Sequence, residues 1–196
     1  IFADFLARHP GVRGELSLSD KNVNLVDEGV DVAVRIGRLG DSSLQVRPAG
    51  ATRRVLVASP AYLRGRPPIA VPNDLAGHAL IQLTPLAPLG DWTFGRRDDE
   101  TRIRVDATFT TNSADAAILH AERGGGIAQV LSYQAWGALR AGRLSRVLAA
   151  WEPPPVPIQL VHPGSRRPPA SVRAFVDFVV AHRSWDFTSG PAAPGG

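Results

Sequence analysis

Cysteine is absent from the 196 residues, which excludes a disulfide framework, a thiolate metal site and a cysteine nucleophile. Lysine is almost absent as well, since Lys21 is the only one and arginine supplies the other basic side chains. A P-loop for phosphate needs a Gly-Lys-Ser/Thr run, so this class of nucleotide site is excluded.

Long apolar runs are also missing. None approaches the roughly 20 residues that a helix needs to cross a bilayer. Asp4, Arg8 and His9 interrupt the N-terminal segment, which therefore lacks the apolar core of a signal peptide. We expect a cytoplasmic protein.

The composition that remains is typical of a soluble globular chain, with 44% hydrophobic and 20% charged residues. A net charge of +4 permits contact with nucleic acid but does not require it. The arginine pairs are scattered along the chain: Arg53-Arg54, Arg96-Arg97 and Arg166-Arg167. We interpret this charge as a solvated surface, and it does not favour direct binding of nucleic acid by this chain.

Short apolar runs alternate with helical patterns, which predicts an α/β fold. The predicted helices are Phe2–Leu6, Asn22–Glu28 closed by Gly29, Pro60–Leu63, a turn at Asn73–Leu75, Ala114–Ala121, Gln134–Arg140 and about Ser171–Trp185. The predicted strands are Glu15–Ser19, a buried Val32–Ile36, Leu44–Val46, Val55–Ala58, Ile81–Leu83, Trp92–Phe94, Ile103–Val105, Thr108–Thr110, Ile127–Val130, Leu144–Leu148 and Ile158–Val161.

Two positions predict domain boundaries. A new unit begins after Gly50, and Pro153–Pro157 is typical of a stiff, extended linker. We therefore expect residues 1–49 and 156–185 to form one subdomain and residues 50–152 a second. Residues 186–196, rich in proline, glycine and alanine, are predicted to be a disordered tail.

No motif nominates a catalytic mechanism. Gly124-Gly125-Gly126 resembles half of a dinucleotide fingerprint, but it follows a helix and precedes a strand, the reverse of that site's order. The five histidines lack metal-ligand spacing, and no serine lies in a Gly-x-Ser-x-Gly elbow. Asp98-Asp99-Glu100 lies among arginines and predicts a solvated loop. The sequence predicts no enzyme, no metal and no cofactor.

Two segments are better candidates for binding a ligand. Arg35 lies in an apolar strand, where a buried guanidinium needs a partner, either Asp31, Asp41 or the anionic group of a ligand. Asn112-Ser113 precede an alanine-rich helix, whose N-terminal N–H groups suit a small carboxylate. Capping of that helix by Asn112 or Ser113 explains the same residues without a ligand.

The segments, taken in order, resemble the effector-binding domain of LysR-type transcriptional regulators. The stretches that carry the resemblance are Phe5–Pro10, Leu25–Gly37, Asp41–Leu44, Val57–Leu63, Asp91–Phe94, Gly124–Ala128 and Arg173–Phe178. The resemblance implies two Rossmann-like subdomains joined by two crossover strands, similar to type II periplasmic binding proteins. It also implies that the first subdomain lacks its first strand, because the chain starts inside the helix that follows that strand.

The resemblance further implies a small effector held in the cleft between the subdomains. One lip would be formed by Arg35, Ile36 and Gly37. The opposing lip would be formed by Ser59, Pro60, Asn112, Ser113 and Gln129. Arg47, Pro48 and Pro155 would lie at the hinge.

The partners follow from the same resemblance. We expect a small organic acid or aromatic as the effector, and a homodimer through the first helix and the helix of about Ser113–Arg123. Promoter DNA would be bound only through a winged helix-turn-helix that this chain lacks. The alternative hypothesis is a free-standing solute-binding protein of the same fold.

Overall fold

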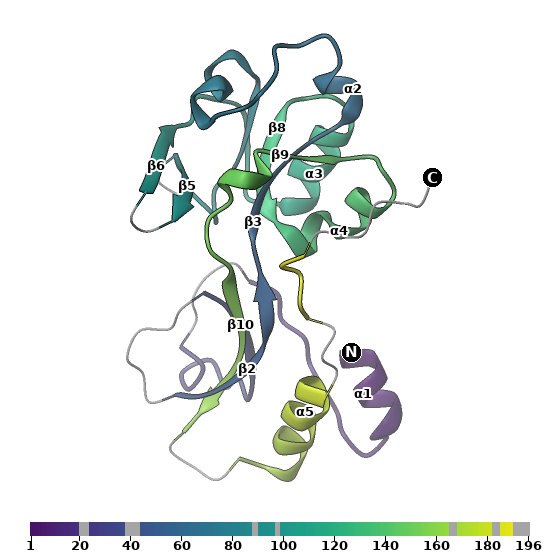
Figure 1. The fold of residues 1–196 in the computed structure, drawn as a ribbon. Coiled ribbons are helices and arrows are strands. Elements are labelled where there is room, and N and C mark those ends of the chain that lie inside the picture. The colour runs from purple at the N-terminus through teal and green to yellow at the C-terminus, as the bar shows by residue number, and fades with distance from the viewer. Residues whose placement is uncertain are drawn as a thin grey trace. The chain divides into compact units, whose positions relative to one another are not determined.

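The chain forms two compact units (Figure 1). The computed structural model describes residues 1–19, 24–37, 44–87, 90–96, 99–164, 168–181 and 185–189. Unit 1 comprises Ile1–Ala51 and Val156–Asp186, and unit 2 comprises Thr52–Pro155 and the chain from Phe187 onward. The chain therefore passes between the units three times. The first passage adjoins Gly50 and the second lies within the proline-rich segment.

Unit 1 pairs three strands with two helices. Its elements are α1 (Phe2–Arg8), β1 (Ala33–Ile36), β2 (Leu44–Thr52), β10 (Val156–Pro163) and α5 (Ala170–Ala181). The strand order is β1-β10-β2, and β1 runs antiparallel to β10 with Ala33 opposite Val161. Helix α5, which the sequence predicts, packs on Leu160 of β10 through the buried residues Val172, Val176 and Val179.

Helix α1 is held in unit 1 by an aromatic cluster. Phe5 is 2% exposed, and its ring lies 5.1 Å from that of Phe175 and 5.5 Å from that of Phe178, both on α5. The guanidinium of Arg8 lies over the Phe178 ring at 5.2 Å. The helix predicted over Phe2–Leu6 is confirmed and ends before Pro10.

Unit 2 is built on a five-stranded sheet of order β7-β4-β8-β3-β9. Its elements are β3 (Arg54–Ala58), α2 (Pro60–Leu63), η1 (Pro72–Gly77), β4 (Leu80–Leu83), β5 (Asp91–Arg96), β6 (Asp99–Arg104), β7 (Ala107–Thr111), α3 (Ala114–Glu122), β8 (Ile127–Leu131), α4 (Ser132–Arg140), β9 (Ser145–Val147) and η2 (Ala149–Trp151). Strands β5 and β6 form a separate antiparallel hairpin.

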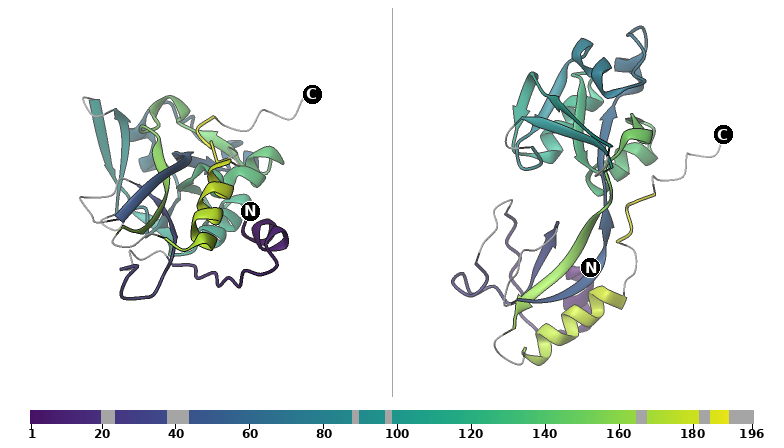
Figure 2. Two further views of the ribbon diagram at one scale, coloured as in Figure 1. Left: turned by 90° about the horizontal axis from the view of Figure 1, so that it is seen from below. Right: turned by 60° about the vertical axis from the view of Figure 1, so that its left-hand side comes forward.

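Each face of this sheet carries its own apolar layer. Helices α3 and α4 lie on one face of the sheet (Figures 1 and 2). Val55 and Val57 of β3 pack with the buried residues of these two helices. The opposite face holds Leu56 and Ala58, packed with Trp92 of β5 and neighbouring residues. Successive side chains of a strand point to opposite faces, so β3 contributes to both layers.

Two predicted strands differ from the structure. Residues 15–19 form no strand: Leu16 is 63% exposed and Leu18 is 86% exposed, and no described strand pairs with them. That strand was predicted only from the alternation of Leu16 and Leu18. Such alternation does not show whether a second strand lies beside the segment to pair with it. The strand at Val32–Ile36 forms, but it is not buried, since Val34 is 49% exposed and Ile36 is 38% exposed. Val34 and Ile36 lie two residues apart and so share one face of β1, whose one partner strand among the described residues is β10.

Two predicted helices also differ. Asn24–Gly29 is a single turn in which the N–H of Glu28 donates to the carbonyl of Asn24. Gly29 has the expected left-handed conformation (φ 64°), while Asn22 lies outside the described residues. The last helix is described to Ala181, and Trp185 is not helical, because its carbonyl accepts from the N–H of Ala51 at 3.1 Å.

The C-terminal segment corrects the prediction of a disordered tail for residues 186–189. Asp186 forms a parallel bridge with Ala51. The carbonyl of Phe187 accepts from the hydroxyl of Ser132 at 2.6 Å, and its ring packs edge-on against Trp136 at 5.6 Å. Disorder was predicted from the proline, glycine and alanine of this segment, and the prediction did not take account of Phe187. Residues 190–196 lie outside the described residues.

Replacing Phe187 by alanine is expected to lower the free energy of unfolding by about 1–2 kcal/mol, because the ring contacts with α4 are lost. Urea unfolding followed by circular dichroism measures this change. A variant with the stability of the parent chain would show that the segment after Asp186 contributes nothing to the fold.

Candidate functional site

Strand direction decides which residues of unit 2 can meet. Strands β4, β7 and β8 are parallel, whereas β3 runs antiparallel to β8 with Val57 opposite Ala128. The carboxyl ends of the three parallel strands and the start of β3 therefore lie along the same edge of the sheet, the one formed by strand ends. The end of β3 lies at the opposite edge.

Ser59 and Pro60 lie at that opposite edge, away from Asn112 and Ser113. Ser59 is 3% exposed, and its hydroxyl caps α2 by accepting from the N–H of Tyr62 at 3.2 Å. Pro60 occupies the first turn of α2. The structure thus does not bring these two residues together with Asn112 and Ser113 as a single lip.

Asn112 and Ser113 lie at the carboxyl edge, between β7 and α3. Ser113 is exposed and caps α3, its hydroxyl accepting from the N–H of Ala116 at 3.3 Å. Its own N–H donates to the hydroxyl of Thr111 at 3.0 Å. The capping interpretation from the sequence is confirmed, and binding of a ligand by the same residue stays a prediction.

Gln129 lies inside the sheet. It is 2% exposed, and β8 places it opposite Leu56 of β3. On its other side, Ile81 of β4 is level with Ala128, so the next residues of the two parallel strands, Gln82 and Gln129, are neighbours. Both side chains point to the face of Leu56, because the residues that flank them belong to the layer under α3 and α4.

The two glutamines share an unusual property. The side-chain carbonyl oxygens of Gln82 and Gln129 are buried and have no hydrogen-bond partner among the described residues. The amide nitrogen of Gln82 is used, since it donates to the carbonyl of Ala87. A buried acceptor without a donor costs about 1–3 kcal/mol, so native proteins supply one from water or a ligand. Sequence reasoning missed Gln82, although a glutamine inside the apolar run Ile81–Leu83 was the available signal.

Unit 1 has a comparable pair of polar side chains. Arg35 is half-buried in β1 and lies directly opposite Gln159 of β10. The side-chain carbonyl oxygen of Gln159 is also buried without a partner in the described part of the chain. Sequence reasoning missed Gln159 as well. Asp41, one suggested partner of Arg35, lies outside the described residues.

Ile36 and Gly37 follow Arg35 at the end of β1. The N–H of Gly37 donates to the carbonyl of Pro157 at 2.9 Å. Gly37 has a φ of 119°, and a side chain there would meet no atom of the described residues within 4 Å.

The predicted hinge residues fall at different places. Arg47 and Pro48 lie within β2, where Arg47 forms an exposed ion pair of 3.8 Å with Asp177 of α5. The chain passes into unit 2 after Ala51 instead. Pro155 is the last residue of unit 2 before β10.

The remaining motifs have structural roles. Gly124 ends α3 with a φ of 81°, and a side chain at Gly126 would collide with the carbonyl of Ala79. His162 is buried at the end of β10, and Glu100 pairs with Arg102 at 2.7 Å in the β5–β6 hairpin.

The described residues contain no group of three or more His, Asp or Glu that could hold a metal. No described helix is both long and apolar enough for a membrane span.

Residues 1–184 match the LysR substrate binding domain. The chain belongs to this family, the effector-binding regulatory part of LysR-type transcriptional regulators. It is 32% identical over 182 residues to the HTH-type transcriptional regulator PtxR of Pseudomonas aeruginosa, covering 93% of this chain and 58% of that protein. It is 29% identical over 179 residues to the HTH-type transcriptional regulator CrgA of Neisseria meningitidis, covering 90% of this chain and 59% of the relative. The chain thus spans somewhat more than half the length of these relatives.

Solved structures of LysR-type regulatory domains have the same fold. The CrgA regulatory domain superimposes with a TM-score of 0.81 at 27% identity, over 93% of this chain and 90% of that one. The regulatory domain of AphB from Vibrio vulnificus gives a TM-score of 0.77 at 26% identity, over 92% and 88% of the two chains. The LysR-family chain therefore has the type II periplasmic-binding-like fold that the sequence predicts.

The two glutamines of unit 2 should respond differently to replacement by leucine. In Gln129→Leu we expect unchanged or higher stability without ligand, because an acceptor lacking a partner is removed. In Gln82→Leu the gain from removing the same kind of acceptor is offset, because the carbonyl of Ala87 loses its donor, and we expect lower stability than in Gln129→Leu. Denaturant unfolding of both variants checks this, and a strongly destabilised Gln129→Leu would contradict it.

Proposed function

We propose that this domain is the effector-sensing and dimerisation part of a bacterial LysR-type transcription regulator, and that its effector is a small organic acid or aromatic. The observation that carries the proposal is the set of buried glutamine carbonyls without partners on a fold of this family. Such acceptors fit a ligand that brings its own O–H or N–H donors.

Each unit contributes residues of suitable chemistry. In unit 2, Gln82 and Gln129 accept hydrogen bonds, and Ser113 offers a hydroxyl at the exposed start of α3. In unit 1, Arg35 supplies a positive charge next to the carbonyl of Gln159. A carboxylate group suits Arg35 and Ser113, while hydroxyl or amino groups suit the glutamines. Asn112 precedes Ser113 in unit 2, and Ile36 and Gly37 follow Arg35 in unit 1, so we keep them among the proposed effector contacts.

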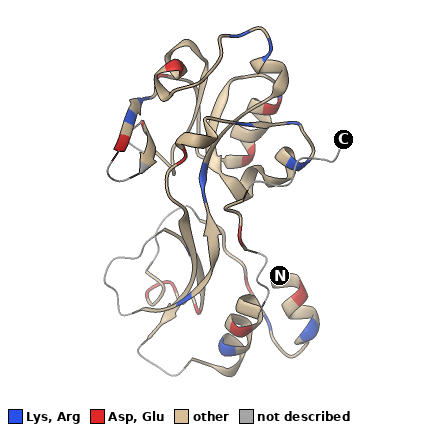
Figure 3. Cartoon of the chain, in the orientation of Figure 1, with Lys and Arg blue, Asp and Glu red and all other residues tan. Residues whose placement is uncertain are grey.

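The domain would bind its ligand without transforming it, because the relatives that it resembles are transcriptional regulators. The relatives are named as HTH-type regulators, and this chain spans 58% of PtxR. We therefore propose that promoter DNA is bound through a winged helix-turn-helix outside this chain, in the cytoplasm. Figure 3 supports this, since basic and acidic residues are scattered over both units. A free-standing solute-binding protein is the less favoured alternative, because these relatives are regulators.

Dimerisation is proposed to use α1 and α3. Helix α3 carries Leu119, which is 50% exposed although its neighbours Ile118 and Ala121 are buried. An exposed leucine on a helix that already buries its other face suits a contact between two copies.

A thermal-shift screen against small acids and aromatics is expected to identify a stabilising effector, since a ligand of the folded state raises the unfolding temperature. Ser113→Ala should then lose most of that shift, because losing a charge-assisted hydrogen bond weakens binding about tenfold or more.

Ser59→Ala is the matched control, because it also removes the capping hydroxyl of a helix but at the other edge of the sheet. Both variants should lose about 1 kcal/mol of stability without ligand. Only Ser113→Ala should lose the effector shift, and an undiminished shift in that variant refutes its place in the site.

The dimer is tested by Leu119→Glu, which should convert it to a monomer in light scattering, because a buried charge at the contact is unfavourable. Leu16→Glu changes a leucine of comparable exposure and should leave the dimer intact. A parent chain that is monomeric at micromolar concentration would contradict the proposal.

A further inference from the structure

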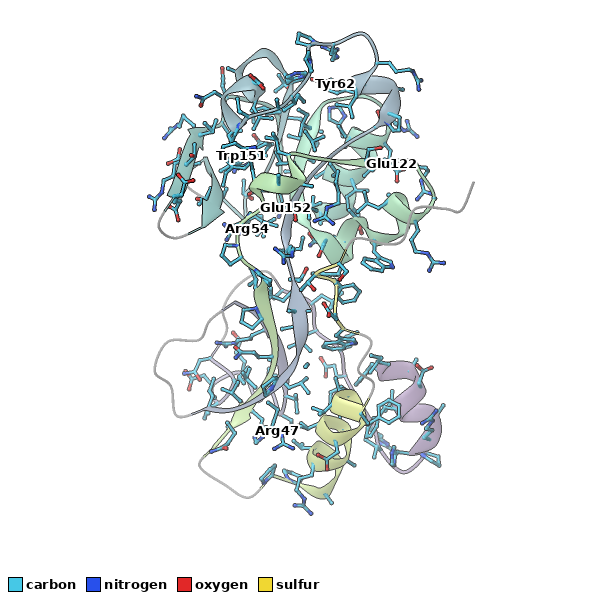
Figure 4. All side chains as sticks on the ribbon, viewed as in Figure 1. Arg47, Arg54, Tyr62, Glu122, Trp151 and Glu152 are labelled. Atoms are coloured by element: carbon cyan, nitrogen blue, oxygen red, sulfur yellow. The ribbon has the colours of Figure 1, made fainter. Side chains whose placement is uncertain are left out.

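Arg54 is a half-buried cation at the start of β3, where Figure 4 labels it. Its guanidinium makes no hydrogen bond or ion pair with any described residue. Burial lowers the pKa of this guanidinium, because water is removed from around the charge. A charge that loses water without gaining a partner is unfavourable, so Arg54 is a candidate for binding an anion from outside the chain.

The register of the sheet puts Arg54 on the same face as the two buried glutamines. Strand β3 pairs with β8 so that Arg54 lies opposite Leu131 and Leu56 lies opposite Gln129. Val55 belongs to the apolar layer that includes residues of α3 and α4, whereas Leu56 belongs to the other layer. Because side chains alternate along a strand and directly paired side chains share a face, Arg54 and Gln129 both point to the face of Leu56.

Arg54 and Gln129 are therefore diagonal neighbours across two paired strands. Residues in this relation are about 7–8 Å apart, which is within the reach of a long side chain. Gln82 follows on the next strand of the sheet, β4, beside Gln129. One face thus carries a cation and then two carbonyl oxygens on three successive strands, all without a partner among the described residues.

We propose, on the basis of the proposed function, that Arg54 binds the acid group of the effector while Gln129 and Gln82 accept hydrogen bonds from a hydroxyl group of the same molecule. The effector class is then a small hydroxy acid. A guanidinium binds a carboxylate through two parallel hydrogen bonds, and a glutamine carbonyl accepts from an O–H group. An acid without a hydroxyl group leaves both carbonyls without a donor, so the glutamines select against it.

A direct hydrogen bond from Arg54 to the carbonyl oxygen of Gln129 is the competing explanation for their placement. Such a bond needs no ligand, and it would make Arg54 a residue that stabilises the fold. The two explanations predict different stabilities for a variant that lacks the guanidinium, because only the second loses a contact within the chain.

The test measures binding of 4-hydroxybenzoate and of 3-hydroxybutyrate to the 196-residue chain by calorimetry. Benzoate and butyrate are the matched analogues, because they keep the acid group and lack the hydroxyl group. At least one of the two hydroxy acids is expected to bind. Its analogue should bind about tenfold more weakly or worse, since the glutamine carbonyls then gain no donor.

The matched variants are Arg54→Gln and Arg64→Gln, which remove the same charge at different places. Arg54→Gln is expected to raise the Kd for the bound hydroxy acid at least tenfold, while the unfolding temperature without ligand stays the same or rises. Arg64 is exposed and follows α2, at the other edge of the sheet, so Arg64→Gln should leave the Kd unchanged. Arg54→Lys keeps the charge but loses the paired donors, and it should have an intermediate Kd.

Gln129→Leu separates the role of the hydroxyl group from that of the acid group. This variant is expected to weaken binding of the hydroxy acid while leaving the Kd of the analogue without the hydroxyl group unchanged. The effects of the variant and of the missing hydroxyl group are then not additive, as expected for two groups that contact each other.

Three results would overturn the proposal. They are no binding of either hydroxy acid up to about 20 mM, an unchanged Kd in Arg54→Gln, and a lower unfolding temperature of Arg54→Gln without ligand, which would assign the guanidinium to Gln129.

The proposed function can fail separately. If no compound of the thermal-shift screen stabilises the chain, the proposed function itself is wrong. If a compound loses its stabilisation in Ser113→Ala but keeps it in Arg54→Gln, the proposed function stands, and the acid group lies at the start of α3 instead of at Arg54.

Discussion

The parallel pairing of β4 with β8 is the constraint on which the account of this domain depends. With Ile81 level with Ala128, it places Gln82 beside Gln129 inside an otherwise apolar sheet. Their carbonyl oxygens then have no donor among the described residues, an arrangement that costs free energy unless something supplies one. Gln82 also has a structural role, since its amide nitrogen donates to the carbonyl of Ala87. The same pairing gathers the ends of β4, β7 and β8 at one edge, where the exposed cap of α3 lies.

The family relationship and these polar groups answer different questions. Similarity to regulatory domains over most of the chain establishes the fold and the class of protein. The choice of ligand depends on individual side chains, since one fold can hold many sites. In this domain the buried side-chain carbonyls without a donor among the described residues belong to Gln82 and Gln129 in unit 2 and to Gln159 in unit 1.

Much of the fold could be predicted from the sequence, because the relevant signals are local. The stripe of Val172, Val176 and Val179 predicted α5, and Pro60 predicted the start of α2. Failures occurred where a neighbour in space decides the outcome. Leu16 and Leu18 alternate like a strand but find no partner, and Phe187 is fixed by α4, which is distant in sequence.

The candidate site was only partly accessible to the same reasoning. Ser113 was named from its place before an alanine-rich helix and Gln129 through the resemblance. Ser59 was grouped with Ser113 because sequence position does not reveal strand direction. Gln82 and Gln159 were missed because what distinguishes them is a buried carbonyl oxygen without a hydrogen-bond donor among the described residues, and only the structure reveals this.

The most direct test of the central claim is an NMR titration of the side-chain amide signals of Gln82 and Gln129 with an effector from the thermal-shift screen. The account predicts that both signals shift and saturate with the dissociation constant measured by calorimetry. If both stay unchanged at saturation while backbone signals elsewhere move, the buried glutamines do not contact the effector and the account is wrong.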